Sequence, residues 1–276
     1  MRRTVAAAAV AVVAAGCGGA GNQPAPSASR SPAPPATTAP AVQTPANERP
    51  PDLRTACGTT EGLSATPLWL RTADGVRLYA VEAGTGSTAV VLAHEGRDSL
   101  CGSWLPYARR LVRSGFRALL FDFRGNGQSE SVAGRKALRL DRDLAAAVRR
   151  ARAGGARRVF LIGASLGGAA AVQNGASLPV SGIVSLSGTR IWPGFGINHY
   201  ASLPRLRVPF LYLGTTDDSA APEKEARDIY GRVGSKDKRI VLYRGSLHAT
   251  AFVEYAPFAP RARALILGWL HRHERG

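Results

Sequence analysis

The apolar residues of the chain fall in short runs that alternate with segments of helical periodicity. Residues 76–81 alternate between apolar and polar positions, which predicts an edge strand. Six further runs are almost continuously apolar, as expected for strands of a sheet that is covered on both faces. These runs are residues 89–93, 117–121, 158–162, 182–186, 208–213 and 240–243.

Helical patterns lie between and after these runs. An apolar stripe predicts a helix that buries Leu140, Leu144, Ala147, Val148 and Ala151 on one side. A last helix is predicted over residues 260–273, with Leu265, Ile266, Trp269 and Leu270 facing inward. Alternating strands and helices predict one α/β domain over residues 53–276, with a mostly parallel twisted sheet and helices on both faces.

The N-terminus has the features of an export signal. A basic start, Met1–Thr4, precedes an Ala and Val run from Val5 to Ala15. As a helix this run spans about 16 Å, too short for a hydrocarbon core of about 30 Å. Residues 1–16 are therefore predicted to be a signal peptide. The junction ending in Cys17 resembles the lipobox of bacterial lipoproteins, which implies that Cys17 is acylated. An ordinary signal peptide with a chance cysteine is the alternative.

Residues 17–52 differ in composition from the rest of the chain. They are rich in Pro, Ala, Ser and Thr, contain almost no large apolar residue, and hold nine of the 18 prolines. Such a segment cannot bury enough apolar surface to fold and is predicted to be a disordered tether. Together these features predict an extracytoplasmic protein that is lipid-anchored to the bacterial cell membrane.

Two cysteines remain if Cys17 carries lipid. In an oxidising compartment the pair Cys57 and Cys101 favours a disulfide. Two free thiols are the alternative interpretation.

The strongest chemical signal is the pentapeptide G-x-S-x-G at residues 163–167. It follows a predicted strand and precedes an Ala-rich helical stretch, which is the context of a nucleophile elbow. The sharp turn would expose the hydroxyl of Ser165 and leave the backbone N–H of Leu166 free to bind an oxyanion. A Gly-rich turn with an incidental serine is the alternative.

Two partners follow in chain order. Asp217 comes after the strand at 208–213, and His248 comes after the strand at 240–243. The order Ser165, Asp217, His248 is that of the α/β-hydrolase triad. Asp218 is the competing acid, and Asp217 is preferred because it occupies a G-x-x-D position.

With these motifs, residues 66–276 resemble a bacterial α/β-hydrolase of the compact, dienelactone-hydrolase-like or peptidase-like kind. Residues 92–96 resemble the loop that supplies an oxyanion-hole N–H, and residues 121–129 resemble the D-x-R-G-x-G-x-S loop. The resemblance assigns this N–H to Gly96, with Glu95, which stands where the family has glycine, as the alternative. Only 52 residues separate Ser165 from Asp217, so no inserted lid domain is expected.

The resemblance implies a serine hydrolase that cleaves carboxylic esters, thioesters or amides through an acyl-enzyme. The substrate would be a small molecule or derive from the cell envelope, and no cofactor or metal is expected. Two other functions are weighed: an acyltransferase acting on envelope lipids or glycans, and a noncatalytic surface-binding lipoprotein on a hydrolase scaffold. His94 is expected to support its loop, and Asp122 is expected to be structural.

The charge of the chain adds one question. The formal net charge is +17, of which the first 52 residues carry +2, so the folded domain carries +15. Export removes nucleic acid as the obvious partner of such a basic protein. The stretch from Arg135 to Arg158 contains nine basic residues and only two acidic ones, Asp141 and Asp143. This excess reflects either an arginine-biased composition or contact with anionic lipid headgroups.

Overall fold

The computed structural model describes residues 49–198 and 201–275. The predicted signal peptide, Cys17 and residues 18–48 of the predicted tether lie outside the described residues. No helix in the described stretches has the length and apolar character needed to cross a bilayer.

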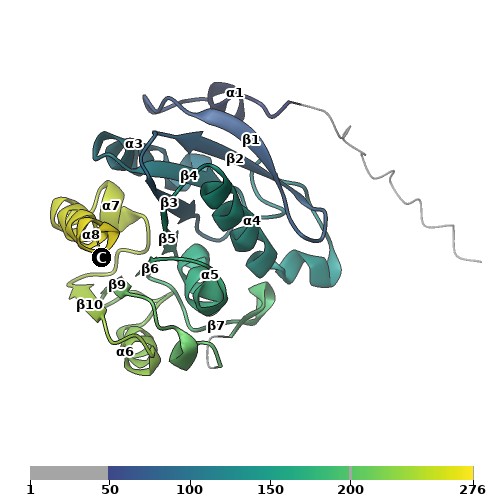
Figure 1. Cartoon of the computed structure of the whole chain (residues 1–276). Helices are drawn as coiled ribbons and strands as arrows, with labels where there is room; N and C mark the ends of the chain where they lie inside the picture. The colour runs from purple at the N-terminus through teal and green to yellow at the C-terminus, as the bar shows by residue number, and fades with distance from the viewer. Residues whose placement is uncertain (1–48, 199–200, 276) are drawn as a thin grey trace, which may run out of the picture. The chain divides into compact units, whose positions relative to one another are not determined.

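An eight-stranded sheet forms the centre of the folded domain (Figure 1). Its order is β1 (Thr66–Arg71), β2 (Arg77–Ala83), β4 (Arg117–Phe121), β3 (Thr88–Ala93), β5 (Arg158–Ala164), β6 (Gly182–Leu186), β9 (Phe210–Thr215) and β10 (Lys238–Tyr243). The β1–β2 and β2–β4 pairs are antiparallel, and every other pair is parallel. The predicted mostly parallel sheet is thus confirmed.

One strand was placed wrongly by the sequence pattern. The predicted edge strand is β2, which pairs on both sides, and β1 occupies the edge instead. The segment of β1 was missed because Pro67 and two adjacent bulky residues, Leu68 and Trp69, interrupt a clean alternation of apolar and polar positions.

Helices cover both faces of the sheet, as predicted. On one face α4 (Leu140–Ala153), α5 (Leu166–Asn174) and α6 (Glu223–Arg232) bury their apolar sides. On the other face lie α3 (Leu105–Arg113) and α8 (Ala259–Glu274), with the short helices α1 (Leu53–Cys57), α2 (Leu100–Ser103) and α7 (Ala251–Glu254). The parallel strands β3, β4, β5, β6 and β9 are buried almost throughout, so they provide a rigid base for the loops at their carboxyl ends.

The segment between β6 and β9 holds no inserted domain among its described residues. It contains the hairpin β7 (Ile191–Trp192) and β8 (Ile197–Asn198), with the 3₁₀ turns η3 (Pro193–Phe195) and η4 (Leu203–Arg205). The side-chain amide of Gln173 in α5 holds the hairpin, because it donates to the carbonyl of Gly196 at 3.0 Å and accepts from the N–H of Asn198 at 2.6 Å. The two remaining 3₁₀ turns are η1 (Gly134–Leu138) and η2 (Gly175–Ser177).

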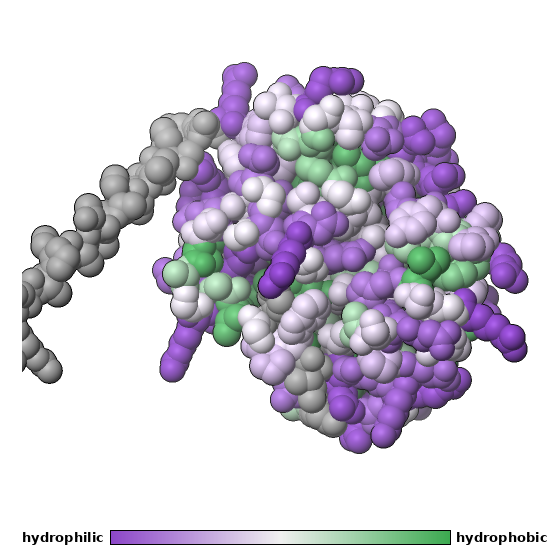
Figure 2. All heavy atoms as spheres, turned by 180° about the vertical axis from the view of Figure 1, so that it is seen from behind, coloured by the Kyte–Doolittle hydropathy of each residue, from purple (hydrophilic) through white to green (hydrophobic). Residues whose placement is uncertain are grey.

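Most of the basic side chains between residues 135 and 158 are engaged within the domain. Three pair with carboxylates and three donate to backbone carbonyls or a hydroxyl: Arg139, Arg142 and Arg150, then Arg149, Arg152 and Arg157. Among the described residues, Arg135, Lys136 and Arg158 have no such partner, and they lie before and after α4 rather than on it. Figure 2 shows hydrophobic residues only in small separate groups on the hydrophilic face it presents.

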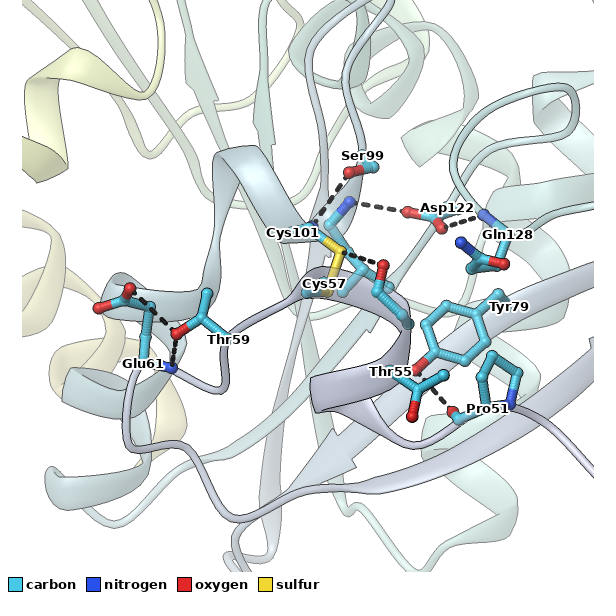
Figure 3. Close-up of a disulfide and its surroundings, with 12 residues drawn as sticks. Pro51, Thr55, Cys57, Thr59, Glu61, Tyr79, Ser99, Cys101, Asp122 and Gln128 are labelled. Atoms are coloured by element: carbon cyan, nitrogen blue, oxygen red, sulfur yellow. Dashed lines mark hydrogen bonds between the residues drawn. A yellow bond between two sulfur atoms is a disulfide. The ribbon is translucent and has the colours of Figure 1, made fainter.

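The predicted disulfide is present. Cys57 of α1 is bonded to Cys101 of α2 with a Cα–Cα distance of 5.3 Å (Figure 3). The bond closes a separation of 44 residues, worth about 4 kcal/mol in the chain-entropy model before any strain is subtracted. Nearby, the hydroxyl of Tyr79 donates to the carbonyl of Pro51 at 3.0 Å. These contacts attach the first described segment to the sheet.

Candidate active site

Ser165 lies in the sharp turn between β5 and α5. Its backbone is strained, with φ 47° and ψ −112°, a conformation that L-residues rarely adopt. Glycine is required on both sides of it. A Cβ at Gly163 would come within 2.3 Å of the backbone of Gly167, and one at Gly167 would lie 2.2 Å from the carbonyl oxygen of Ala93. The pentapeptide therefore forms the predicted elbow.

Backbone N–H groups without acceptors lie beside the elbow. Leu166 is the first residue of α5, and no described residue accepts a hydrogen bond from its N–H or from those of Glu95 and Gly96. A Cβ built on Gly96 would lie 3.6 Å from the Cβ of Leu166, so the two residues are neighbours. This arrangement has the donors that an oxyanion hole needs.

The buried ring of His94 holds this loop through two hydrogen bonds. Its Nδ1 hydrogen-bonds the carbonyl oxygen of Glu95 at 2.6 Å, and its Nε2 accepts the N–H of Phe123 at 2.9 Å. Burial lowers the pKa of His94 to about 4, so the imidazole is neutral at pH 7. With both ring nitrogens occupied, His94 holds the loop in place and has no free nitrogen to act as a base, as expected.

Asp122 is also structural. It is fully buried and accepts the N–H groups of Leu100 at 2.7 Å and Gln128 at 2.9 Å. Burial raises its pKa to about 6.

The acid beside His248 is Asp218, which corrects the preference for Asp217. Asp218 Oδ2 lies 2.7 Å from His248 Nδ1, and its other oxygen accepts the N–H groups of Ala220 and Ala221. Asp217 is exposed, and its Oδ2 accepts the hydroxyl of Thr216. The backbone decides between them: the N–H of Asp217 bonds the carbonyl of Gly245 at 2.9 Å, and the turn that follows directs only Asp218 inward.

The electrostatics of Asp218 suit it to orient an imidazole. Burial alone would raise the pKa of its carboxyl, but the hydrogen bond and charge of His248 and the donors Ser187 and Ala221 outweigh burial. The pKa of Asp218 therefore lies below its ordinary value, and the group is ionised at neutral pH.

The end of β6 brings the three predicted regions together. The carbonyl of Leu186 accepts the N–H of Ser165 at 2.8 Å. The next residue, Ser187, is fully buried with φ 49°. Its hydroxyl accepts the N–H of Ala249 at 3.2 Å and also helps to lower the pKa of Asp218. Sequence analysis missed Ser187, although a polar residue directly after an apolar strand was an available signal.

The hairpin after β6 contributes a wall to this region. The Cη2 atom of Trp192 lies 3.3 Å from the position that a Cβ on Gly96 would take. The half-buried indole therefore lies directly against the candidate oxyanion loop, where a side chain at position 96 would contact it tightly.

The described residues form no candidate metal site. No group of three His, Cys, Asp or Glu side chains is arranged to hold a metal ion among them.

Comparisons with known proteins agree with this fold. Residues 85–198, which include Ser165, match the family described as serine aminopeptidase, S33. An esterase of Pyrococcus furiosus has a TM-score of 0.68 at 16% identity, covering 77% of this chain and 92% of that one. A monoacylglycerol lipase of Paleococcus ferrophilus has a TM-score of 0.61 at 20% identity, covering 71% and 99%. A thermophilic esterase of Thermogutta terrifontis has a TM-score of 0.62 at 18% identity, covering 76% and 100%.

The two adjacent acids can be separated by mutation. We expect Asp218→Asn to lower kcat by roughly 10⁴-fold towards an ester that the wild type cleaves, because the amide would stabilise the wrong imidazole tautomer. Asp217→Asn is the matched control and should stay within about threefold of wild type, since among the described residues its carboxylate bonds only Thr216. Steady-state kinetics on both variants decide the assignment. A large loss in Asp217→Asn with Asp218→Asn unaffected would reverse it.

Proposed function

We propose that this chain, which has an α/β-hydrolase fold, is a serine hydrolase of the carboxylesterase-like kind and cleaves carboxylic esters through the triad Ser165, Asp218 and His248. The observation that carries this proposal is that the nucleophile, acid and histidine loops all meet at the end of β6. The strained nucleophile turn bonds Leu186, the histidine loop bonds the adjacent Ser187, and the hydroxyl of Ser187 also helps to lower the pKa of Asp218. A strained serine and an imidazole–carboxylate pair whose loops are held by the same end of β6 are suited to nucleophilic catalysis.

In the proposed reaction, Ser165 Oγ attacks the ester carbonyl while His248 Nε2 takes the serine proton. The Asp218 carboxylate accepts the Nδ1–H of His248, which fixes the tautomer and stabilises the imidazolium. The N–H groups of Leu166 and Gly96 hold the negative oxygen of the tetrahedral intermediate. The imidazolium then protonates the departing alkoxide, which leaves an acyl group on Ser165. Water, deprotonated by His248, attacks this acyl-enzyme. The bond between the acyl carbon and Ser165 Oγ then breaks, the imidazolium returns its proton to Oγ, and the acid is released.

Esters are proposed ahead of amides for two reasons. Among its described residues, the segment between β6 and β9 adds only a short hairpin and two 3₁₀ turns, with no large cap that would enclose a peptide end. The solved structures named above are esterases and a monoacylglycerol lipase. Because the matched family is described as serine aminopeptidase, aminoacyl anilides are the natural comparison substrates.

We also propose that the protein is anchored outside the cytoplasm by lipid on Cys17, with residues 18–52 as the tether. This proposal rests on the basic start, the short apolar run and the lipobox-like junction. The disulfide supports an oxidising compartment. The net positive charge of the domain would add attraction to anionic headgroups. Most arginines around α4 also bond partners within the domain, which favours an arginine-biased composition over headgroup contact as the reason for that charge.

The nucleophile is tested with a fluorophosphonate probe and a panel of p-nitrophenyl esters beside aminoacyl anilides. We expect the probe to label Ser165, and Ser165→Ala to lose labelling together with roughly 10⁴–10⁶-fold of ester turnover. Ser114→Ala, at the C-terminal end of α3, is the matched control and should keep both. Folded wild-type protein that neither reacts with the probe nor cleaves any ester would refute the proposed activity.

The anchor is tested by expressing the full chain in a bacterium that processes lipoproteins. Wild-type protein should fractionate with membranes and incorporate a fatty-acid analogue. Cys17→Ser should do neither, because it lacks the thiol that is acylated. Equal membrane association of the two proteins, or a wild type without lipid, would contradict the proposed anchor.

A further inference from the structure

Glu95 makes a long-range contact that the triad and the oxyanion hole leave unexplained. Its Oε1 atom accepts the backbone N–H of Thr250 at 2.9 Å and also the hydroxyl of Thr250. The two residues are 155 positions apart in the sequence, and both are partly buried. One carboxylate oxygen thus receives both donors of a single residue.

The contact joins two loops with different tasks in the proposed reaction. Glu95 lies between His94 and Gly96, and its own carbonyl accepts the ring N–H of His94. Thr250 lies two residues after His248 and immediately before α7. The side chain of Glu95 therefore connects the loop that supplies the oxyanion N–H to the loop that supplies the base.

The His248 loop needs support from its surroundings. Ala249 has φ 51°, a left-handed conformation that is unfavourable for alanine. Two other bonds hold the same loop: the hydroxyl of Thr215 donates to the carbonyl of Leu247 at 2.7 Å, and Ser187 accepts the N–H of Ala249. These bonds come from β9 and from the end of β6. The bond from Glu95, after β3, is the one that comes from the oxyanion loop itself.

We propose that Glu95 is a positioning residue, which acts through Thr250 to fix His248 relative to Ser165 and the oxyanion N–H groups. This inference rests on the proposed esterase function. It explains why a glutamate is accommodated beside an oxyanion hole, where its negative charge would otherwise be unfavourable. The carboxylate is turned towards Thr250 and is engaged there by two donors.

Four single variants, one double variant and one control separate positioning from a general effect on stability. Glu95→Gln keeps a carbonyl oxygen that can accept both donors of Thr250, whereas Glu95→Ala removes the acceptor. Thr250→Val removes the hydroxyl and keeps the backbone N–H, and Thr250→Ser keeps both. Glu82→Ala is the control for a lost carboxylate. Glu82 lies on β2, outside the proposed site, and pairs with Arg117 and Arg150.

We expect Glu95→Ala to lower kcat about 10- to 100-fold with KM changed less than about threefold, because the reacting groups lose alignment. The rate of fluorophosphonate labelling at Ser165 should fall in parallel. Glu95→Gln should restore kcat to within about threefold of wild type. Thr250→Val should show a smaller loss, Thr250→Ser should resemble wild type, and the Glu95→Ala/Thr250→Val double variant should be little worse than Glu95→Ala. Glu82→Ala should keep kcat even if its unfolding temperature drops.

Several results would overturn the inference. One is an unchanged kcat in Glu95→Ala, and another is a loss in Glu95→Gln as large as in Glu95→Ala. If Glu95→Ala does not fold, wild-type kcat in Thr250→Val would count against it in the same way. A wild type that is active while these variants are unaffected refutes the positioning role alone. A wild type without labelling or ester cleavage refutes the proposed function as well.

Discussion

The candidate site depends on the backbone at the carboxyl end of β6. There the carbonyl of Leu186 bonds the nucleophile turn and the hydroxyl of Ser187 bonds the histidine loop. The same hydroxyl helps to lower the pKa of the acid, Asp218. The segments that follow β5, β9 and β10 are far apart in the sequence, and they are held together at the end of β6. Because β6 is fully buried between β5 and β9, that point is as rigid as the sheet itself.

Three residues around this point have left-handed backbones without being glycine: Ser165, Ser187 and Ala249. Each such residue costs of order 1–3 kcal/mol, which persists only where surrounding bonds determine the conformation. The bonds to Leu186, to Ser187 and from Glu95 to Thr250 are those determinants. The favourable free energy of packing the buried sheet offsets the strain at these residues, so the reacting groups stay in fixed positions. Electrostatic and proximity catalysis require such fixed positions.

The sequence predicted features that depend on local pattern. Continuous apolar runs located the parallel strands, and the glycines at 163 and 167 located the elbow, because close packing there excludes any Cβ. The pair Cys57 and Cys101 followed from composition and compartment. These features need little information about distant parts of the chain.

Features that depend on tertiary contacts were beyond a single sequence. Asp217 and Asp218 are identical neighbours, and a backbone bond to Gly245 decides which of them faces His248. The Glu95–Thr250 contact spans 155 residues without any local pattern.

Asp143 is a further example of a tertiary contact. It counted from the sequence as an acid among basic residues, yet it lies fully buried against the guanidinium of Arg124 at 2.7 Å.

The pairing of His248 with Asp218 is most directly tested by proton NMR of the folded protein with ¹⁵N-labelled histidine. A strongly hydrogen-bonded Nδ1–H should give one far-downfield resonance assigned to His248. The resonance should disappear in Asp218→Asn and persist in Asp217→Asn. A resonance that survives in Asp218→Asn, or that is lost in Asp217→Asn, would contradict the arrangement described for this site.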